Sequence, residues 1–313
     1  MKLLKGVVLA GVLVALSACS SDKVSDWGAA EAEQETHEGG ARQARPVTEA
    51  EALEVIVGYN EANRQAYEDL DATALEEVAA GSLLQRATAE ITRAVEISGG
   101  DQGMAENREY TDPKLIIPGE GWWMADVAAG DDRRLLTFAQ GDDGQWLLVS
   151  AVSLNTELPP IATDENGFAA TAPDDDRSSR FLPRDAAPAY QDLWETGGEQ
   201  SGSTLAATQG GADILEQRTP DDPMLLARYT PITPEHTDLW VLRTQDGGTL
   251  TIGHVAHTET VTALRLPGGA AAEYNPEPRN PLQTRHTGEF AMWMPAGDFP
   301  EILGDEWTKL GAL

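Results

Sequence analysis

The stretch RLLTFAQGDDGQWLLVSAVSL (134–154) decides the fold class of this chain. The runs on either side of GDDG (141–144) are apolar, and glycine with aspartate between two such runs is typical of the turn in a β-hairpin. Shorter strand-like runs precede it at 115–117 and 122–127. This part of the chain therefore predicts an antiparallel sheet whose strands follow one another in sequence order.

Helices are predicted ahead of this sheet. Thr48-Glu-Ala-Glu51 fits a capping box, and apolar residues recur at three-to-four spacing from Leu53 to Leu70. A second helical stretch covers 74–80, and a third starts at Ser82, where SLLQ again fits a capping box. Helices followed by a meandering sheet predict an α+β domain over residues 47–157.

The second half of the chain keeps the order of helix and then sheet. Residues 158–187 are rich in proline and acidic residues and are interpreted as an extended connector. A second α+β domain is predicted over 188–313, with a late strand at 289–294 and a short helix near 300–303. We thus expect two domains, each with helices packed on a curved antiparallel sheet.

The two halves share one local pattern. The hairpin sequence at 135–154 can be laid without gaps on 239–258, and both segments contain a strand, a turn rich in aspartate and glycine, and a second strand. Few residues are identical, and any two hairpins share these features. Internal duplication is therefore a hypothesis only.

The first 18 residues are predicted to be a signal peptide. A basic start precedes an apolar run of eleven residues, 6–16, whereas a membrane-spanning helix needs about 20. Leu16-Ser17-Ala18-Cys19 resembles the lipobox of bacterial lipoproteins, in which the chain is cut before the cysteine and the thiol carries a diacylglycerol. The resemblance implies cleavage between Ala18 and Cys19 and an anchor on the outer face of the cell membrane. The alternative is a small buried cysteine after an ordinary signal.

The chain is strongly acidic. Its formal net charge is −30, and the mature chain, without Lys2 and Lys5, would carry −32 from 20 basic and 52 acidic residues. Such a charge repels phosphate backbones, so nucleic acid is excluded as a partner. Residues 19–46 are polar and lack a periodic apolar pattern, which predicts a disordered tether. The expected partners are the membrane, through the anchor, and a cell-wall component or envelope protein.

Signatures of metal, cofactor or catalytic chemistry are weak. His254 and His257 lie three apart in a segment with strand-like alternation, so their rings are expected on opposite faces and cannot share one ion. The aspartate-rich loops lack the spacing of a calcium-binding loop. The sequence contains no G-x-S-x-G, Walker or H-E-x-x-H motif. We therefore expect no cofactor, no metal and no catalytic residue.

Aromatic residues offer the best ligand hypothesis, because sugar rings stack on exposed aromatic side chains. Trp122 and Trp123 would lie on opposite faces of a strand, so at most one of them belongs to the core. Core packing is the competing interpretation for all of these aromatic residues. The candidate pocket comprises Tyr59, Asn63, Tyr67, Tyr110, Trp122 and Trp123.

Several longer stretches resemble an actinobacterial lipoprotein family of uncharacterised function. They include YTDPKLIIP (110–118), GWW (121–123), LPPIATDENGFA (158–169) and VLRTQDGGTLTIGHVAHTETVT (241–262). The layout is also similar to that of nuclear-transport-factor-2-like domains, in which helices cover a curved sheet and leave a cone-shaped cavity. Because that class hosts both enzymes and binding modules, the likeness does not decide the function.

Three functions follow from these patterns. The leading interpretation is a lipid-anchored, non-catalytic binding or scaffold module at the cell envelope. The alternative is a cone-pocket enzyme acting on a small apolar or glycan-derived ligand, with Asp112 or Glu61 as acid–base residue and a carboxyl of raised pKa in a closed cavity. A purely structural spacer is the third.

Overall fold

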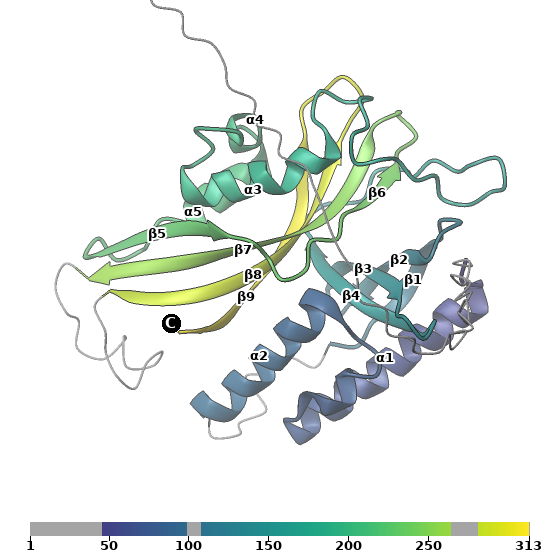
Figure 1. The fold of residues 1–313 in the computed structure, drawn as a ribbon, viewed down its shortest axis with the longest axis horizontal. Helices are drawn as coiled ribbons and strands as arrows, with labels where there is room; N and C mark the ends of the chain where they lie inside the picture. The colour runs from purple at the N-terminus through teal and green to yellow at the C-terminus, as the bar shows by residue number, and fades with distance from the viewer. Residues whose placement is uncertain (1–45, 99–107, 264–280, 313) are drawn as a thin grey trace, which may run out of the picture. The chain divides into compact units, whose positions relative to one another are not determined.

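The computed structural model describes residues 46–98, 108–263 and 281–312. The predicted signal peptide and lipidation site, Ala18 and Cys19 included, lie outside the described residues, as does almost all of the predicted tether 19–46. The described residues form one compact unit. It contains two antiparallel sheets with helices around them, which confirms the α+β class (Figure 1).

The first sheet is the predicted meander. Its four strands follow the chain in the order β1-β2-β3-β4, and all neighbouring pairs are antiparallel. The turn between β3 and β4 places Gly144 at φ +83°, a conformation that glycine adopts without steric cost. The elements of this half are α1 (Glu49–Asp69), the 3-10 helix η1 (Ala72–Leu75), α2 (Gly81–Ser98), β1 (Thr111–Ile116), β2 (Trp122–Ala129), β3 (Asp132–Gln140) and β4 (Trp146–Leu154).

The capping predictions fared differently at the two long helices. The Thr48 hydroxyl accepts a hydrogen bond from the Glu51 N–H (3.2 Å), which confirms the cap of α1. The cap predicted for Ser82 is wrong, because α2 begins at Gly81 and the Ser82 hydroxyl bonds to other elements instead.

The helix predicted over 74–80 is also wrong, because only a 3-10 turn ends there, at Leu75. The backbone of residues 78–80 forms hydrogen bonds with β4 instead. Ala80 N–H donates to the Leu148 carbonyl (3.0 Å), and Leu148 N–H donates to the Val78 carbonyl (2.9 Å). A backbone group bonded to a sheet strand is not available to a helix.

The second sheet has the order β5-β7-β8-β9, and β6 also pairs with β7. The helix predicted near 300–303 is wrong, because β9 starts at Glu301 and pairs with β8. Ile302 and Leu303 are both buried, in two different apolar clusters on opposite faces of the strand. The elements are η3 (Pro183–Asp185), α3 (Ala186–Glu195), α4 (Ser203–Ala206), α5 (Gln209–Gln217), β5 (Leu225–Ile232), β6 (Trp240–Arg243), β7 (Thr249–Ala263), β8 (Leu282–Met294) and β9 (Glu301–Ala312).

Successive apolar side chains of a strand point to opposite faces of its sheet, and both faces of each sheet are buried. In β3, Leu136 and Phe138 pack with α1 and α2, whereas Leu135 lies in a second cluster on the other face of the sheet. This second cluster joins the sheets, because it also contains Leu250 of β7 and Leu303 of β9. The remaining face of the second sheet is covered by α3, α4 and α5 (Figure 1).

The connector lies along both sheets. Residues 161–172 form bridges and backbone hydrogen bonds with β6, as in Ala162 N–H to the Arg243 carbonyl (2.9 Å), and Ala169 N–H donates to the Ile117 carbonyl (2.9 Å). The domain limits predicted at 157 and 188 stay predictions. None of the helices in the described ranges is long and apolar enough to cross a bilayer.

Candidate functional site: a cationic cavity

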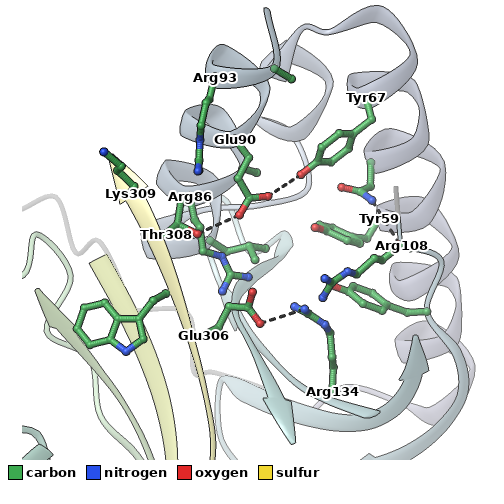
Figure 2. Close-up of a pocket in the computed structure, with 16 residues that line it drawn as sticks. Tyr59, Tyr67, Arg86, Glu90, Arg93, Arg108, Arg134, Glu306, Thr308 and Lys309 are labelled. Carbon is green, nitrogen blue, oxygen red and sulfur yellow. Dashed lines mark hydrogen bonds and ion pairs between the residues drawn. The ribbon is translucent and has the colours of Figure 1, made fainter. Parts of the chain in front are cut away.

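A cavity of about 320 Å³ lies between helices α1 and α2, the segment ahead of β1, and strand β9 (Figure 2). Its wall mixes aromatic, cationic and acidic side chains with a few small apolar ones. The lining residues are Tyr59, Asn63, Tyr67, Leu83, Arg86, Ala87, Glu90, Arg93, Ala94, Arg108, Tyr110, Arg134, Glu306, Trp307, Thr308 and Lys309.

Four of the six predicted pocket residues line this cavity. Tyr59, Asn63 and Tyr67 are spaced four apart on α1, so they share one face of the helix. Tyr110 joins them because Asn60 holds its backbone: the Asn60 amide donates to the Tyr110 carbonyl (2.9 Å) and accepts from the Tyr110 N–H (3.0 Å). Of these two asparagines of α1, Asn60 therefore binds backbone beside the cavity and Asn63 lines it.

The two tryptophans lie elsewhere. Trp123 is fully buried and stacks on Phe138, with 4.0 Å between ring centroids. Trp122 points to the other face of β2, is half-buried, and donates its indole N–H to Glu120 (3.1 Å). Their opposite orientations are those expected of neighbours on a strand, and neither residue lines the cavity.

The charge of the cavity wall is opposite to that of the chain. Five cationic side chains line it, against two carboxylates, in a chain of net charge −30. Sequence reasoning missed this cluster because its members come from four separate segments. The available signal was the spacing of Arg86, Glu90 and Arg93 on α2, which places all three on one helix face. The five cations are Arg86, Arg93, Arg108, Arg134 and Lys309.

Both carboxylates of the wall are already hydrogen-bonded or ion-paired. Glu90 accepts from the Tyr67 hydroxyl (3.0 Å) and from the Thr308 hydroxyl (2.9 Å). Glu306 pairs with Arg134 (3.0 Å). Internal partners thus offset the negative charge of the wall, while the five cations outnumber the two carboxylates.

Two deep arginines have unused donors. Arg86 and Arg134 are only 5% and 3% exposed, and the buried Nη1 of Arg86 and Nε of Arg134 have no hydrogen-bond partner. Burial opposes the charge of Arg86, but Glu289 and Glu306 raise its pKa above the usual value, so it stays protonated. A buried donor without a partner is costly, and an oxyanion in the cavity would relieve that cost.

The tyrosines act as neutral donors. Burial raises the pKa of Tyr110 to about 12, and burial together with the neighbouring tyrosines raises the pKa of Tyr59 well above its ordinary value. Both hydroxyls therefore keep their protons at any physiological pH and can donate to an anion. The rings of Tyr59 and Tyr110 stack, with centroids 5.7 Å apart, which fixes this wall of the cavity.

A like-charge pair lies at the other end of the cavity. Burial lowers the pKa of Lys309, and Arg93 lowers it further, while Glu259 acts in the opposite direction. Arg93 and Lys309 are thus within electrostatic reach of each other, although Glu259 acts on Lys309 more strongly than Arg93 does. Figure 2 shows Arg93 on α2 and Lys309 on β9, both on the side of Glu90 away from Arg134.

The two sheet histidines do not share their contacts. Both lie on β7, as predicted, and they have separate surroundings: His254 contacts Ser82 (2.9 Å), whereas His257 packs against Trp307 and His286. Burial lowers the pKa of His257 to about 3, and His286 contributes to the shift. In the described ranges, no three acidic, histidine or cysteine side chains are arranged to hold an ion.

One serine, histidine and glutamate do meet in space. The Ser82 hydroxyl donates to Glu289 (2.5 Å) and contacts Nδ1 of His254 (2.9 Å). This is not a nucleophile and base ready for catalysis, because serine lies between the other two and all three are at most 4% exposed. None of them lines the cavity, so we assign them a structural role between the sheets.

The acid–base residues proposed for an enzyme lie outside the cavity. Glu61 is exposed and pairs with Arg64 (3.9 Å), and Asp112 is exposed on β1. A carboxyl with a raised pKa does exist at Asp305, where burial is the main cause, but it bonds to Tyr190 under α3 and does not line the cavity.

Comparison with known proteins finds one family model and two similar lipoproteins. A family model described as a domain of unknown function (DUF8094) matches residues 43–307. Two uncharacterised lipoproteins of Streptomyces coelicolor, SCO6871 and SCO2278, are similar to this chain. The first is 28% identical over 239 residues, 70% of this chain and 67% of the relative. The second is 26% identical over 238 residues, 72% of each. The resemblance to a lipoprotein family is confirmed, whereas the likeness to nuclear-transport-factor-2-like domains stays a prediction.

Proposed function

The chain belongs to the DUF8094 family, and from this premise we propose that it is a lipoprotein anchored through Cys19 on the outer face of the cell membrane. We further propose that its folded unit is a non-catalytic binding module whose cationic cavity takes a small anion. Support for the anchor comes from Leu16-Ser17-Ala18-Cys19 after a signal-like run and from relatives named as lipoproteins. Two acyl chains would hold the protein firmly, since each buried methylene contributes about 0.8 kcal/mol.

The observation that carries the binding role is the reversal of charge. The cavity wall carries five cations and two bonded carboxylates in a chain of net charge −30, so its excess positive charge would attract an anion. Arg86 and Arg134 add buried donors that make no hydrogen bond, although Arg86 Nη1 lies 3.8 Å from Glu289. The acidic exterior repels anions in general, so affinity for an anion would be confined to the cavity.

The anchor is tested by Cys19→Ala. We expect the full-length wild-type protein to remain with the cell membrane fraction, and the variant to lose this association because no thiol is left to acylate. Metabolic labelling with a radioactive fatty acid, followed by fractionation, measures both effects. Ser20→Ala is the matched control and should be labelled like the wild type. A variant that keeps its label and its membrane association would contradict the anchor.

The binding role is tested with Arg108→Gln. Arg108 is half-buried at the cavity wall, so its replacement should not disrupt the core. We expect the full-length protein in detergent to bind citrate or inorganic phosphate saturably in calorimetry. The variant should bind about tenfold more weakly, as expected for the loss of one charged hydrogen bond. Arg64→Gln, an exposed arginine on α1 outside the cavity, should bind as the wild type does.

Two results would count against this site. If neither anion binds, the cavity is not an anion site of this kind. If Arg108→Gln and Arg64→Gln bind equally well, binding takes place elsewhere on the protein.

The enzymatic alternative differs from a binding module in one measurable respect. Glu90 and Glu306 are the carboxyls of the cavity, and both are bonded to partners in the wall. A binding module should return its ligand unchanged after prolonged incubation, whereas a cone-pocket enzyme would convert it. Mass spectrometry of the incubated ligand separates the two functions. For a binding module, the natural ligand would be a negatively charged cell-wall component or a negatively charged group on an envelope protein.

A further inference from the structure

The cations of the cavity fall into two groups. Arg86, Arg108 and Arg134 lie at one end with Glu306, and Figure 2 shows them converging below Tyr59 and beside it. Arg86 and Arg108 both act on the pKa of Tyr110, which places them within electrostatic reach of the same ring. We call these three arginines the inner group.

The outer group consists of Arg93 and Lys309. Arg93 lies about two turns beyond Arg86 on α2, and Lys309 lies near the end of β9. Each is half-buried, and the charge of Arg93 acts on the pKa of Lys309. The outer group therefore forms its own positive region, at a different end of the same cavity (Figure 2).

Glu90 lies between the two groups. Its carboxylate bridges α1 and β9 through the Tyr67 and Thr308 hydroxyls, and Figure 2 shows this bridge with the inner group on one side and the outer group on the other. A carboxylate offers about four acceptor positions, of which these hydroxyls occupy two. The middle of the cavity therefore repels an anionic group but can accept hydrogen bonds from uncharged hydroxyls.

We propose that the ligand is a small polyhydroxylated molecule with an anionic group at each end. One anionic group would lie on the inner group, where Arg86 Nη1 and Arg134 Nε have unused donors. The other would lie between Arg93 and Lys309, and the hydroxyls between them would donate to Glu90. This inference rests on the proposed function, and it adds the number of charges and the chemistry between them.

The cavity has the size for such a ligand. A volume of about 320 Å³ corresponds to roughly ten water molecules at about 30 Å³ each, which is the space of a six-carbon chain with its oxygens. Tyr59, stacked on Tyr110, adds an aromatic face beside the middle of the cavity. A flat aromatic face next to hydroxyl acceptors suits the C–H and O–H surfaces of a sugar-like chain.

Three six-carbon probes separate the parts of this proposal. Glucarate has two carboxylates and four hydroxyls, gluconate lacks one of the carboxylates, and adipate lacks all the hydroxyls. We expect the full-length protein in detergent to bind glucarate at least tenfold more tightly than either of the others. Sorbitol 1,6-bisphosphate against sorbitol 6-phosphate repeats the comparison with phosphates and shows which anionic group the cavity prefers.

The double variant Arg93→Gln with Lys309→Gln isolates the outer group. Both side chains are half-buried at the cavity wall, so the fold should survive, and unfolding curves will verify this. We expect the variant to bind glucarate only as tightly as it binds gluconate. Arg64→Gln again serves as the control and should keep the tenfold preference.

The outcomes distinguish this inference from the proposed function. If gluconate binds as tightly as glucarate to the wild type, and the phosphate pair agrees, the two-charge ligand is wrong while an anion site stands. If adipate equals glucarate, the role assigned to Glu90 is wrong. If the double variant keeps the preference, the outer group does not hold the second charge. If citrate, phosphate and all the probes fail to bind, both proposals fall together.

Discussion

Replacing Glu289 with glutamine is expected to reduce the free energy of unfolding by about 3 to 5 kcal/mol, the range found when one partner of a buried ion pair is removed. Glu289 is 1% exposed on β8, and its carboxylate reaches across to the first half of the fold. It accepts from Ser82 (2.5 Å), Ser150 (2.9 Å) and the Ala151 N–H (2.8 Å). Arg86 lies 3.8 Å away.

The glutamine variant is expected to be less stable for two physical reasons. Its amide N–H₂ would face donors that now meet a carboxylate oxygen, so at least one buried hydrogen bond is lost. The buried guanidinium of Arg86 would also lose its countercharge. Urea unfolding of the full-length protein in detergent measures the effect. Glu301→Gln, a half-buried acid at the start of β9, is the control and should cost less than about 1 kcal/mol.

A double variant tests whether Arg86 and Glu289 act as a pair. Because Arg86→Gln removes the charge that Glu289→Gln would leave unpaired, the double variant should be destabilised by clearly less than the sum of the single variants. Simple additivity would contradict the pairing. The same experiment bears on the cavity, since the Arg86 side chain that Glu289 holds in place also lines it.

The parts of the fold that depend on local sequence were predicted well. The cap at Thr48 and the turn at 141–144 act over a few neighbouring residues, and both are present in the structure. The failures all involve partners far along the chain. Ser82 bonds to Glu289, which is 207 residues away, instead of capping its own helix. The segment 300–303 is extended because β8 pairs with it.

The candidate site shows the same division. Tyr59, Asn63 and Tyr67 could be grouped from the sequence because one helix face carries all three. Trp123 does not lie beside them, because its ring packs on Phe138 in the core and does not line the cavity. The pocket role of the six residues as ligand contacts stays a prediction.

The sequence did not predict the cluster of cations, for another reason. Arg108, Arg134 and Lys309 lie in three segments that no periodic pattern connects, and only the packing of β9 beside α2 brings them together. In addition, a strongly acidic composition gives no hint of a positive interior. Net charge predicts the behaviour of the surface, whereas the charge of a cavity depends on which few side chains the fold collects there.

The second large effect is expected at Asp192, at the end of α3. Its carboxylate is 5% exposed and accepts backbone N–H bonds from Gln200 (2.9 Å), Ser201 (2.7 Å) and Gly202 (2.9 Å). The loop that it holds packs closely, because a Cβ on Gly198 would lie 2.8 Å from the Gly202 carbonyl oxygen. One side chain therefore closes the turn between α3 and α4.

This loop also supports the cavity. Trp194, two residues further along α3, packs against Trp307 with 5.3 Å between ring centroids, and Trp307 lines the cavity. An α3 that is released from its loop would loosen this contact. The Asp192 variants should therefore weaken anion binding slightly as well as lower stability.

Asp192→Ala should lower the free energy of unfolding by about 3 kcal/mol at pH 7, because it leaves several loop N–H groups without an acceptor. Asp192→Asn keeps an acceptor and should lose only the charge.

Burial acts to raise the pKa of Asp192, but the bonds from Thr196 and the loop N–H groups outweigh it, so the pKa lies below its ordinary value. Because the pKa is lower in the folded state, the ionised carboxylate stabilises the fold fully above the unfolded-state pKa of about 3.9. This stabilisation is lost as the pH falls through the folded-state pKa. The gap between wild type and Asp192→Asn should therefore be full at pH 7 and should close below about pH 4. Urea unfolding at pH 7, 5 and 3 measures it, with exposed Glu195→Gln as the control, and a gap that does not change with pH would refute the role of the charge.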